Sequence, residues 1–309
     1  MALVAFTNAL PADFRLTVAD VGSAGGLQGR WRAVRPWIEA MLFEPREGGA
    51  VRREGQDTIY PTALGAAPGR ATLNITALAN MSSTLTPNAA LLAGFRKKGE
   101  DVEIVDHLEM AVDTLDRICA KDGRLVDAIK VDTQGSELTI LDGAEQALAE
   151  TVLLAEVELS FLPRYHDQAL AEDVLPYMAA RGFDLIELHR PKRYRAKNRS
   201  NVVSPGMGGD QKSGRVAYAD GIFFIREDRL LGRLAAMSAN EAETASLKAM
   251  LLLLIYAKPD MAARLFDLAS DYFEPARRGE LEALFRSLAR RSIGEKVARR
   301  ISKFLGRRA

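Results

Sequence analysis

From residue 16 to about residue 226 the sequence alternates short β-forming runs with helix-forming stretches, and this alternation limits the possible folds more than any other feature. Several β-forming runs are apolar almost throughout, as strands covered by helices on both faces of a sheet must be. The predicted strands are residues 16–21, 39–44, 57–64, 126–132, 152–160, 183–189 and 216–225, with two less regular candidates at 71–76 and 102–110. The predicted helices between them are residues 88–98, 137–150 and 168–181, and a further helix should begin near Leu27 or Gly29. This alternation predicts an α/β fold with a doubly wound, mostly parallel, Rossmann-like sheet.

After Arg226 the β-forming runs stop, and the remaining residues have the spacing of helices. We predict helices over residues 247–257, 260–273 and 275–291, with Pro259 and Pro275 where new helices would begin, since proline suits the first turn of a helix. A boundary near residue 230 therefore divides the chain into a domain of residues 1–230 and a helical C-terminal extension of residues 231–309.

The last twenty residues, 290–309, form a strongly basic tail. They hold eight Lys and Arg residues against Glu295 alone, a net of +7, and apolar residues recur among them at helical spacing. Such a helix can pack its apolar side on the protein, or it can lie on an anionic membrane surface. We expect the first, and peripheral membrane contact through this tail is the alternative.

Composition excludes several classes of protein. The 309 residues carry 42 Lys and Arg against 41 Asp and Glu, a net charge of +1, so no overall field draws the chain to nucleic acid. The single cysteine, Cys119, rules out disulfides within the chain and any site built on several cysteines. The longest apolar run, residues 249–257, is too short to cross a membrane, and the N-terminal residues lack the apolar core of a signal peptide. We therefore expect a cytoplasmic protein.

The first predicted strand runs into a glycine-rich turn that indicates a nucleoside site. The residues of this motif are Asp20, Gly22, Ser23 and Gly26. Glycines at such a turn let a ligand approach the backbone closely and leave N–H groups free to meet it. The second strand ends in Glu44 and Pro45, which places a carboxylate where it can accept hydrogen bonds from a ribose diol.

Two other nucleotide-binding signatures are missing. Ala24 stands where the dinucleotide fingerprint G-x-G-x-x-G requires its second glycine, and the phosphate loop G-x-x-x-x-G-K-[ST] does not occur. A ligand with a ribose but no pyrophosphate fits the motif better, and S-adenosylmethionine is such a ligand. A glycine turn with a purely structural role is the competing interpretation.

A second informative stretch is DAIKVDTQGSE, residues 127–137, followed by LDGA at 141–144. At this point the chain resembles the FkbM-type family of S-adenosylmethionine-dependent methyltransferases. The other segments that carry the resemblance are the glycine turn with Glu44 and Pro45, VDTLD at 112–116, EVE at 156–158, PRY at 163–165 and ADGIFF at 219–224. The resemblance covers roughly residues 16–226 and does not include the C-terminal helices.

The resemblance implies a Rossmann-like methyltransferase sheet, with S-adenosylmethionine lying across the C-terminal ends of the first strands. It also implies methylation of a hydroxyl, often on a sugar or a polyketide-like product. Where family members often carry Glu, this chain has Gln134, which removes a carboxylate that a metal site could use.

Methyl transfer requires the acceptor oxygen close to the methyl and in line with the leaving sulfur, and a base helps when the acceptor is an alcohol. Asp132, at the tip of the middle strand, is the first candidate for this contact, although Asp also suits a helix cap. Glu156 and Glu158 share one face of a buried strand, so one of them can bind substrate or act as base, or they can pair with an arginine. His166 is favoured as general base over His189, and solvation at the surface is the alternative for each. No residues have the spacing of metal ligands, so we expect no metal.

The loop of residues 190–215 is long and carries eight Lys and Arg residues against Asp210 alone. Its charge suits an anionic acceptor such as an acidic sugar or a phosphate, and a solvated flexible loop is the alternative.

These features favour an S-adenosylmethionine-dependent O-methyltransferase acting on a hydroxyl of a glycan or other hydroxylated small product. A nucleic-acid methyltransferase is an alternative, because the basic loop and tail can contact phosphates, but the chain lacks the motifs of base chemistry. A nicotinamide-dependent oxidoreductase is disfavoured by Ala24 in the glycine turn.

Overall fold

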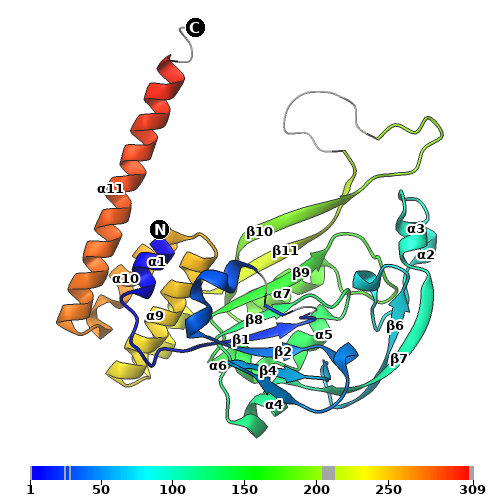
Figure 1. Ribbon diagram of the computed structural model, residues 1–309, viewed down its shortest axis with the longest axis horizontal. Helices are drawn as coiled ribbons and strands as arrows, with labels where there is room; N and C mark the ends of the chain where they lie inside the picture. Colours follow the sequence, from blue (N-terminus) through cyan, green and yellow to red (C-terminus); the bar gives the residue numbers. More distant parts are fainter. Residues whose placement is uncertain (1, 24–25, 28, 204–212, 306–309) are drawn as a thin grey trace. The chain divides into compact units, whose positions relative to one another are not determined.

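The computed structural model describes residues 2–23, 26–27, 29–203 and 213–305, with side chains from residue 3 to residue 290. These residues form two compact units, each built from separate stretches of the chain (Figure 1). The strand-rich unit comprises Leu16–Leu27 and Ile38–Arg226, and the helical unit comprises Met1–Arg15, Gln28–Trp37 and Glu227–Ala309. The helical unit thus resumes at Glu227, close to the predicted boundary, and it also takes residues 1–15 and 28–37 from the segment assigned to the first domain.

An eight-stranded sheet forms the centre of the strand-rich unit, in the order β10-β11-β9-β8-β1-β2-β4-β3. Its strands are β1 (Leu16–Val21), β2 (Ile38–Phe43), β3 (Arg52–Glu54), β4 (Asp57–Tyr60), β8 (Ala128–Val131), β9 (Leu154–Ser160), β10 (Phe183–Tyr194) and β11 (Arg215–Ile225). The pairs from β4 through β2, β1 and β8 to β9 are parallel, while β11 is antiparallel to both β9 and β10. The strand order reverses between β1 and β8, and ligands of open α/β sheets bind at such a switch point. The predicted α/β fold with a doubly wound, mostly parallel sheet is confirmed.

A second, three-stranded sheet has the order β5-β7-β6. It consists of β5 (Ala63–Leu64), β6 (Gly69–Thr76) and β7 (Ile104–Asp113). The two less regular strand candidates pair with each other here, because β6 and β7 are antiparallel from Gly69 to Thr76. The predicted strand 57–64 is divided between the two sheets, since β4 ends before Pro61, which has no N–H to donate to a strand ladder.

Several short helices connect the strands of this unit. They are η2 (Pro45–Glu47), η3 (Ala79–Met81), α2 (Ala89–Leu92), α3 (Lys98–Asp101), α4 (Leu115–Asp122), α5 (Glu137–Asp142), α6 (Glu145–Glu150) and α7 (Ala171–Ala180). The predicted helix 88–98 is wrong as one element, since it is split into α2 and α3 with Lys97 at a φ of 64°. The predicted helix 137–150 is broken at Gly143, where a Cβ would stand 2.0 Å from the carbonyl oxygen of Gly65. Helix α4, capped by Thr114 and Gly123, was not predicted.

The helical unit contains α1 (Ala2–Thr7), η1 (Gly29–Trp37), α8 (Glu227–Ala235), α9 (Ala239–Ile255), α10 (Pro259–Ala269), η4 (Ser270–Tyr272) and α11 (Pro275–Leu305). The predicted helix starts at Pro259 and Pro275 are confirmed, and the helix expected near Gly29 is the 3₁₀ helix η1. The apolar run of α9 supplies a fully buried core, from Leu251 to Leu253. Helix α11 continues through the basic tail to Leu305, but the side chains of the tail from residue 291 lie outside the described residues.

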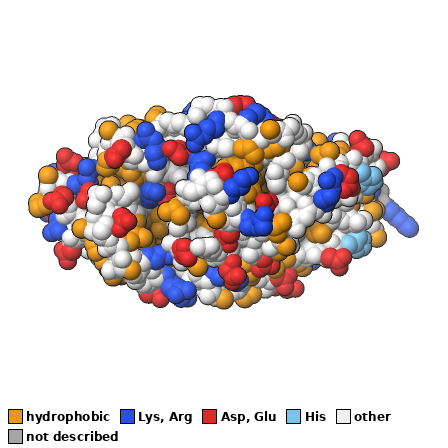
Figure 2. Space-filling view, turned by 90° about the horizontal axis from the view of Figure 1, so that it is seen from below, with side chains coloured by type: hydrophobic (Ala, Val, Ile, Leu, Met, Phe, Trp, Pro, Cys, Tyr) orange, Lys and Arg blue, Asp and Glu red, His pale blue; other side chains and the backbone are white. Residues whose placement is uncertain are grey.

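Among the described residues, no helix is long and apolar enough to cross a membrane. Lys and Arg side chains are interspersed with Asp and Glu side chains on the face shown in Figure 2, in keeping with the net charge of +1.

Candidate functional site

The glycine turn holds the ends of three strands together. Gly22 has a φ of +83°, and a Cβ on it would stand 2.2 Å from the backbone oxygen of Asp132, so only glycine fits. The N–H of Gly22 donates to Phe43 at the end of β2 (3.1 Å), and the N–H of Asp132 donates to Val21 at the end of β1 (3.1 Å). The turn therefore lies against the C-terminal ends of β1, β2 and β8, at the switch point of the sheet.

The N–H groups of the other described turn residues donate to backbone carbonyls, so they are not free to meet a ligand as the motif predicts. Ser23 is buried, and its N–H also donates to the carbonyl of Phe43 (3.4 Å). Gly26 has a φ of +85°, and its N–H donates to the carbonyl of Ser23 (2.7 Å). Ala24 and Gly25, between them, lie outside the described residues.

A buried ion pair lies next to the turn, on strands β1 and β8. The Lys130 ammonium donates to Oδ1 of Asp20 across β1 and β8 (3.1 Å), and Glu156 is the next neighbour in register on β9. Asp20 is 1% exposed, and its Oδ2 has no hydrogen-bond partner among the described residues. Burial raises the pKa of Asp20, against the opposing charge of Lys130. One oxygen of a buried carboxylate can thus accept a further hydrogen bond. A bound donor would offset the free-energy cost of burying this oxygen without a partner.

Glu44 lies at the tip of β2, as predicted, but its carboxylate already has a partner. Arg46 donates from Nε to Oε1 (2.9 Å) and from Nη2 to Oε2 (2.9 Å), and its backbone N–H also reaches Oε1 (3.1 Å). Burial by itself would raise the pKa of Glu44, but the hydrogen bonds and charge of Arg46 outweigh it and lower the pKa. Pro45 begins η2 beside it. Since a carboxylate has about four acceptor positions, Glu44 can still accept from a ribose hydroxyl while Arg46 holds it in place.

A cluster of polar side chains lies at the adjoining ends of β8 and β9. The Gln134 amide nitrogen donates to Oδ1 of Asp132 (2.9 Å) and to Oε2 of Glu158 (3.1 Å), so one neutral group bridges two carboxylates. Its amide oxygen accepts from Nη1 of Arg164 (3.0 Å). Every polar atom of the Gln134 side chain is therefore bonded, and this fixes the relative positions of Asp132 and Glu158.

Arg164 is the buried cation of this cluster. It is 1% exposed, its Nη2 forms an ion pair with Oε1 of Glu158, and the same nitrogen donates to the hydroxyl of Ser160 (3.0 Å). Its guanidinium lies 4.4 Å from the ring centre of Tyr218. Burial raises the pKa of Glu158, with the nearby carboxylates of Asp132 and Glu137 adding to this and Arg164 opposing it. Glu158 therefore has a structural partner, whereas Asp132 is only half-buried.

Glu137 stabilises the turn that carries Gln134. The turn is unusual, because Gln134 has a φ of 61° and Gly135 a φ of 121°. The Glu137 carboxylate accepts from the N–H groups of Thr133 (3.0 Å) and Gly135 (3.0 Å), and it is itself buried. Burial raises the pKa of Glu137, against these backbone hydrogen bonds. Neither Glu137 nor Arg164 was identified as a site residue from the sequence, although both lie inside segments that carry the family resemblance.

His166 lies on the loop after β9 with an exposed side chain, and its backbone N–H donates to Thr86 (2.9 Å). No contact joins it to Asp132 or Glu158 in the described structure, so its role as general base stays a prediction. His189 instead pairs in register with Asp220 of β11. Within the described part of the chain, no group of three or more His, Cys, Asp or Glu residues has the arrangement of a metal site.

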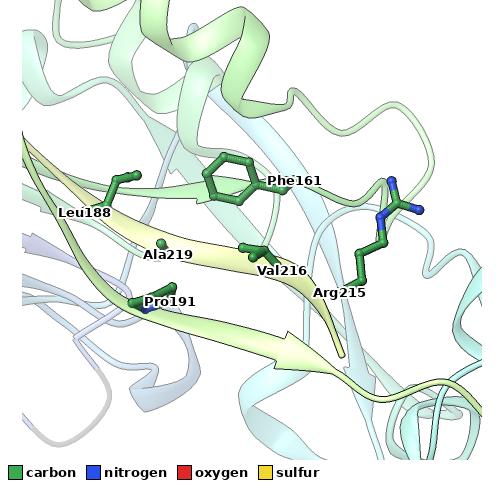
Figure 3. Close-up of a pocket in the computed structure, with 6 residues that line it drawn as sticks. All are labelled: Phe161, Leu188, Pro191, Arg215, Val216 and Ala219. Carbon is green, nitrogen blue, oxygen red and sulfur yellow. The ribbon is translucent and has the colours of Figure 1, made fainter. Parts of the chain in front are cut away.

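An apolar hollow of about 500 Å³ lies on the hairpin of β10 and β11 (Figure 3). It is lined by Phe161, Leu188, Pro191, Arg215, Val216 and Ala219. Because side chains alternate along a strand, Ala219 faces away from the side that carries its neighbours Tyr218 and Asp220. The hollow therefore does not belong to the polar cluster around Asp132.

Comparison with known proteins identifies the domain. The family model of the methyltransferase FkbM domain matches residues 26–185, just over half of the chain. The chain belongs to the FkbM methyltransferase family. The resemblance predicted from the sequence is confirmed, and the match ends before β11 and the C-terminal helices.

Similarity beyond the family model is limited. A crystal structure of a methyltransferase FkbM from Methylobacillus flagellatus KT is 14% identical over 69% of this chain, with a TM-score of 0.37. The aligned part spans 44% of that protein. No curated protein matches the sequence.

Proposed function

We propose that this FkbM-family protein is an S-adenosylmethionine-dependent methyltransferase that methylates a hydroxyl of a glycan or another hydroxylated small product. The observation that carries the cofactor assignment is Oδ2 of Asp20, a buried oxygen without a partner directly below a glycine turn into which no Cβ fits. S-adenosylmethionine has an ammonium donor, a ribose diol and no phosphate. Asp20 would accept a hydrogen bond from the ammonium group, and Gly22 would let the cofactor approach the backbone closely. Glu44 would accept a hydrogen bond from a ribose hydroxyl.

When bound, the cofactor supplies a methyl group on a positively charged sulfur. Around its site the described residues include five carboxyl groups that interact with one another, Asp20, Asp132, Glu137, Glu156 and Glu158, and two buried cations, Lys130 and Arg164. Burial would lower the pKa of Lys130, but the charges of Asp20 and Asp132 raise it, so Lys130 stays a cation. Ionised carboxylates next to the bound cofactor would favour a cationic ligand over a neutral one.

Asp132 is the best-placed residue to receive the proton that the acceptor hydroxyl loses. It lies at the C-terminal end of β8 beside the glycine turn, it is half-buried, and Gln134 orients its carboxylate. Glu158 is held by Arg164 and Gln134, and we assign it to positioning rather than to proton transfer. His166 remains a second candidate base because its side chain is exposed on the loop that follows β9. A cytoplasmic location stays a prediction.

Calorimetric titration with S-adenosylhomocysteine, NAD and ATP tests the cofactor assignment. We expect S-adenosylhomocysteine alone to bind, and binding of NAD or ATP in its place would refute the proposal. In Glu44→Ala the loss of hydrogen bonds to a charged group should weaken binding by about tenfold to a hundredfold. The matched control is Glu54→Ala, which removes an exposed carboxylate that also binds an arginine, Arg52, on the edge strand β3. Equal affinities in these two variants would remove Glu44 from the site.

A further inference from the structure

The end of the β10–β11 hairpin carries a concentrated set of basic side chains, which we call the basic hairpin. Its members are Lys192, Arg193, Arg195, Lys197, Arg199 and Arg215. All six are exposed, and no carboxylate of the described residues forms an ion pair with any of them. Arg52, half-buried on β3 of the same unit, does have such partners, Glu47 and Glu54. Like charges held together without counter-charges repel one another, so the basic hairpin is complementary to an anion.

Backbone contacts hold the basic hairpin on the segment between α2 and α3. The N–H of Arg96 donates to the carbonyl of Arg195 (2.9 Å), and the N–H of Lys197 donates to the carbonyl of Gly94 (2.8 Å). Phe95 packs edge-on against Tyr194 with ring centres 5.6 Å apart. The described basic residues therefore lie on an ordered surface and not on a free loop.

The basic hairpin adjoins the candidate site. Strand β10 runs parallel to β8 and β9, so the C-terminal ends of these strands lie at the same edge of the sheet (Figure 1). Asp132 directly follows β8 at this edge. Lys192 pairs in register with Tyr218, and Tyr218 pairs with Ser160, two residues beyond Glu158 on β9. The Tyr218 ring also contacts the guanidinium of Arg164 (4.4 Å), which binds Glu158. A molecule that reaches the carboxylate cluster can therefore extend onto the basic hairpin.

The residue types of the basic hairpin, and the lack of exposed aromatic rings among the described residues, indicate which kind of anion it binds. Four of the six residues are arginines, whose forked donors suit carboxylate, sulfate and phosphate groups. No Phe, Tyr or Trp side chain is exposed anywhere in the described residues, whereas proteins that hold single-stranded nucleic acid stack its bases on exposed aromatic rings. We infer that the basic hairpin binds a polyanionic glycan, and that this glycan is the methyl acceptor. The role of this glycan as methyl acceptor rests on the proposed function.

Heparin is a suitable probe, because it is a glycan with a dense negative charge. We would measure its affinity for the full-length protein as salt rises from about 50 to about 200 mM, in the wild type and in the triple variant Lys192→Gln/Arg193→Gln/Arg195→Gln. Each lost contact should make the slope of log affinity against log salt shallower by about 0.7 to 0.9. Over this fourfold rise in salt, the factor by which affinity falls should therefore be about 20 to 40 times smaller in the triple variant than in the wild type. The basic C-terminal tail is present in both proteins and cancels in the comparison.

The control is Arg53→Gln/Arg70→Gln/Lys121→Gln, which removes the same charge from exposed positions on β3, β6 and α4 of the same unit. Its slope should match the wild type, and equal slopes in the two triple variants would overturn the inference. Circular dichroism melting checks that both variants fold. Single-stranded DNA and anionic vesicles are the competing ligands. If either binds more tightly than heparin of equal charge, and if only the hairpin variant loses this binding, the assignment to a glycan is overturned.

Titration with S-adenosylhomocysteine separates this inference from the proposed function. The hairpin variant should bind it as the wild type does, since none of its three changes touches the glycine turn. A wild type that binds heparin through the hairpin but does not bind S-adenosylhomocysteine would refute the proposed function and the acceptor role, while the anion-binding surface would stand.

Discussion

Replacing Arg164 by methionine tests whether the carboxylate cluster depends on its one buried cation. Methionine keeps most of the length of the arginine but leaves Glu158, the amide oxygen of Gln134 and the hydroxyl of Ser160 without this donor. Removing one partner of a buried ion pair costs about 3 to 5 kcal/mol of folding free energy, because the other charge stays buried. We expect a loss of this size in Arg164→Met, measured by urea unfolding followed by far-ultraviolet circular dichroism.

The pH dependence of this loss is the sharper test. Burial raises the pKa of Glu158 above its usual value of 4.5, so the folded state binds this proton more tightly than the unfolded chain. The free energy of unfolding contributed by such a carboxyl therefore falls as pH rises from 4.5 through the folded pKa. Without Arg164 the pKa should rise further, so Arg164→Met should be less destabilised at about pH 5.5 than at about pH 8.5.

Two further variants complete the test. Arg264→Met removes the arginine of an exposed ion pair with Glu227, and we expect no measurable loss of stability. The double variant Arg164→Met/Glu158→Leu removes both buried charges and should recover most of the lost stability, because an apolar pair can replace a buried ion pair. A loss in Arg164→Met no larger than in Arg264→Met, or one that stays the same from acid to alkaline pH, would refute the reasoning.

Two other substitutions test the geometry of the site. Gly49→Ala, at a φ of +81° in open space, should cost about 1 to 2 kcal/mol of stability through the positive φ alone. Gly22→Ala should cost more than this, because its Cβ would also overlap the backbone oxygen of Asp132. Only Gly22→Ala should weaken S-adenosylhomocysteine binding, by about tenfold or more. Gln134→Glu should place a third carboxylate in the cluster and create Mn²⁺ binding that electron paramagnetic resonance detects. The control is Gln146→Glu, because the Gln146 amide is exposed and also donates to a carboxylate; this variant should bind no Mn²⁺. Equal spectra for the two variants would show that the carboxylates around Gln134 do not converge.

The sheet could be predicted because its determinants are local. Each strand of its centre is a short apolar run, and β1 was predicted with its observed bounds, Leu16–Val21. The errors arise where distant backbone decides the outcome. Glu137–Glu150 has the periodicity of one helix, but the carbonyl of Gly65 approaches Gly143 so closely that the helix breaks there. No pattern within the helix itself records that contact.

The candidate site divides in the same way. The glycine turn and Glu44 could be found from the sequence, since both depend on a residue type at the end of a strand. The engagement of Glu44 by Arg46 was missed, because the spacing of two residues says nothing of how a turn directs the side chain. Arg164 was missed because its partners are gathered from three separate segments.

The charges of the site and of its surroundings have opposite signs, and the proposed reaction accounts for both. Carboxyl groups are gathered around Asp20 and Asp132, and in their ionised form they favour a sulfonium ligand, whose positive charge methyl transfer removes. The demethylated product, S-adenosylhomocysteine, should therefore bind less tightly than the cofactor and leave more readily. An anionic acceptor would be repelled by the same carboxylates unless cations held it from outside. The basic hairpin lies at the same edge of the sheet, so it can bind the charged groups of a glycan while one neutral hydroxyl reaches Asp132.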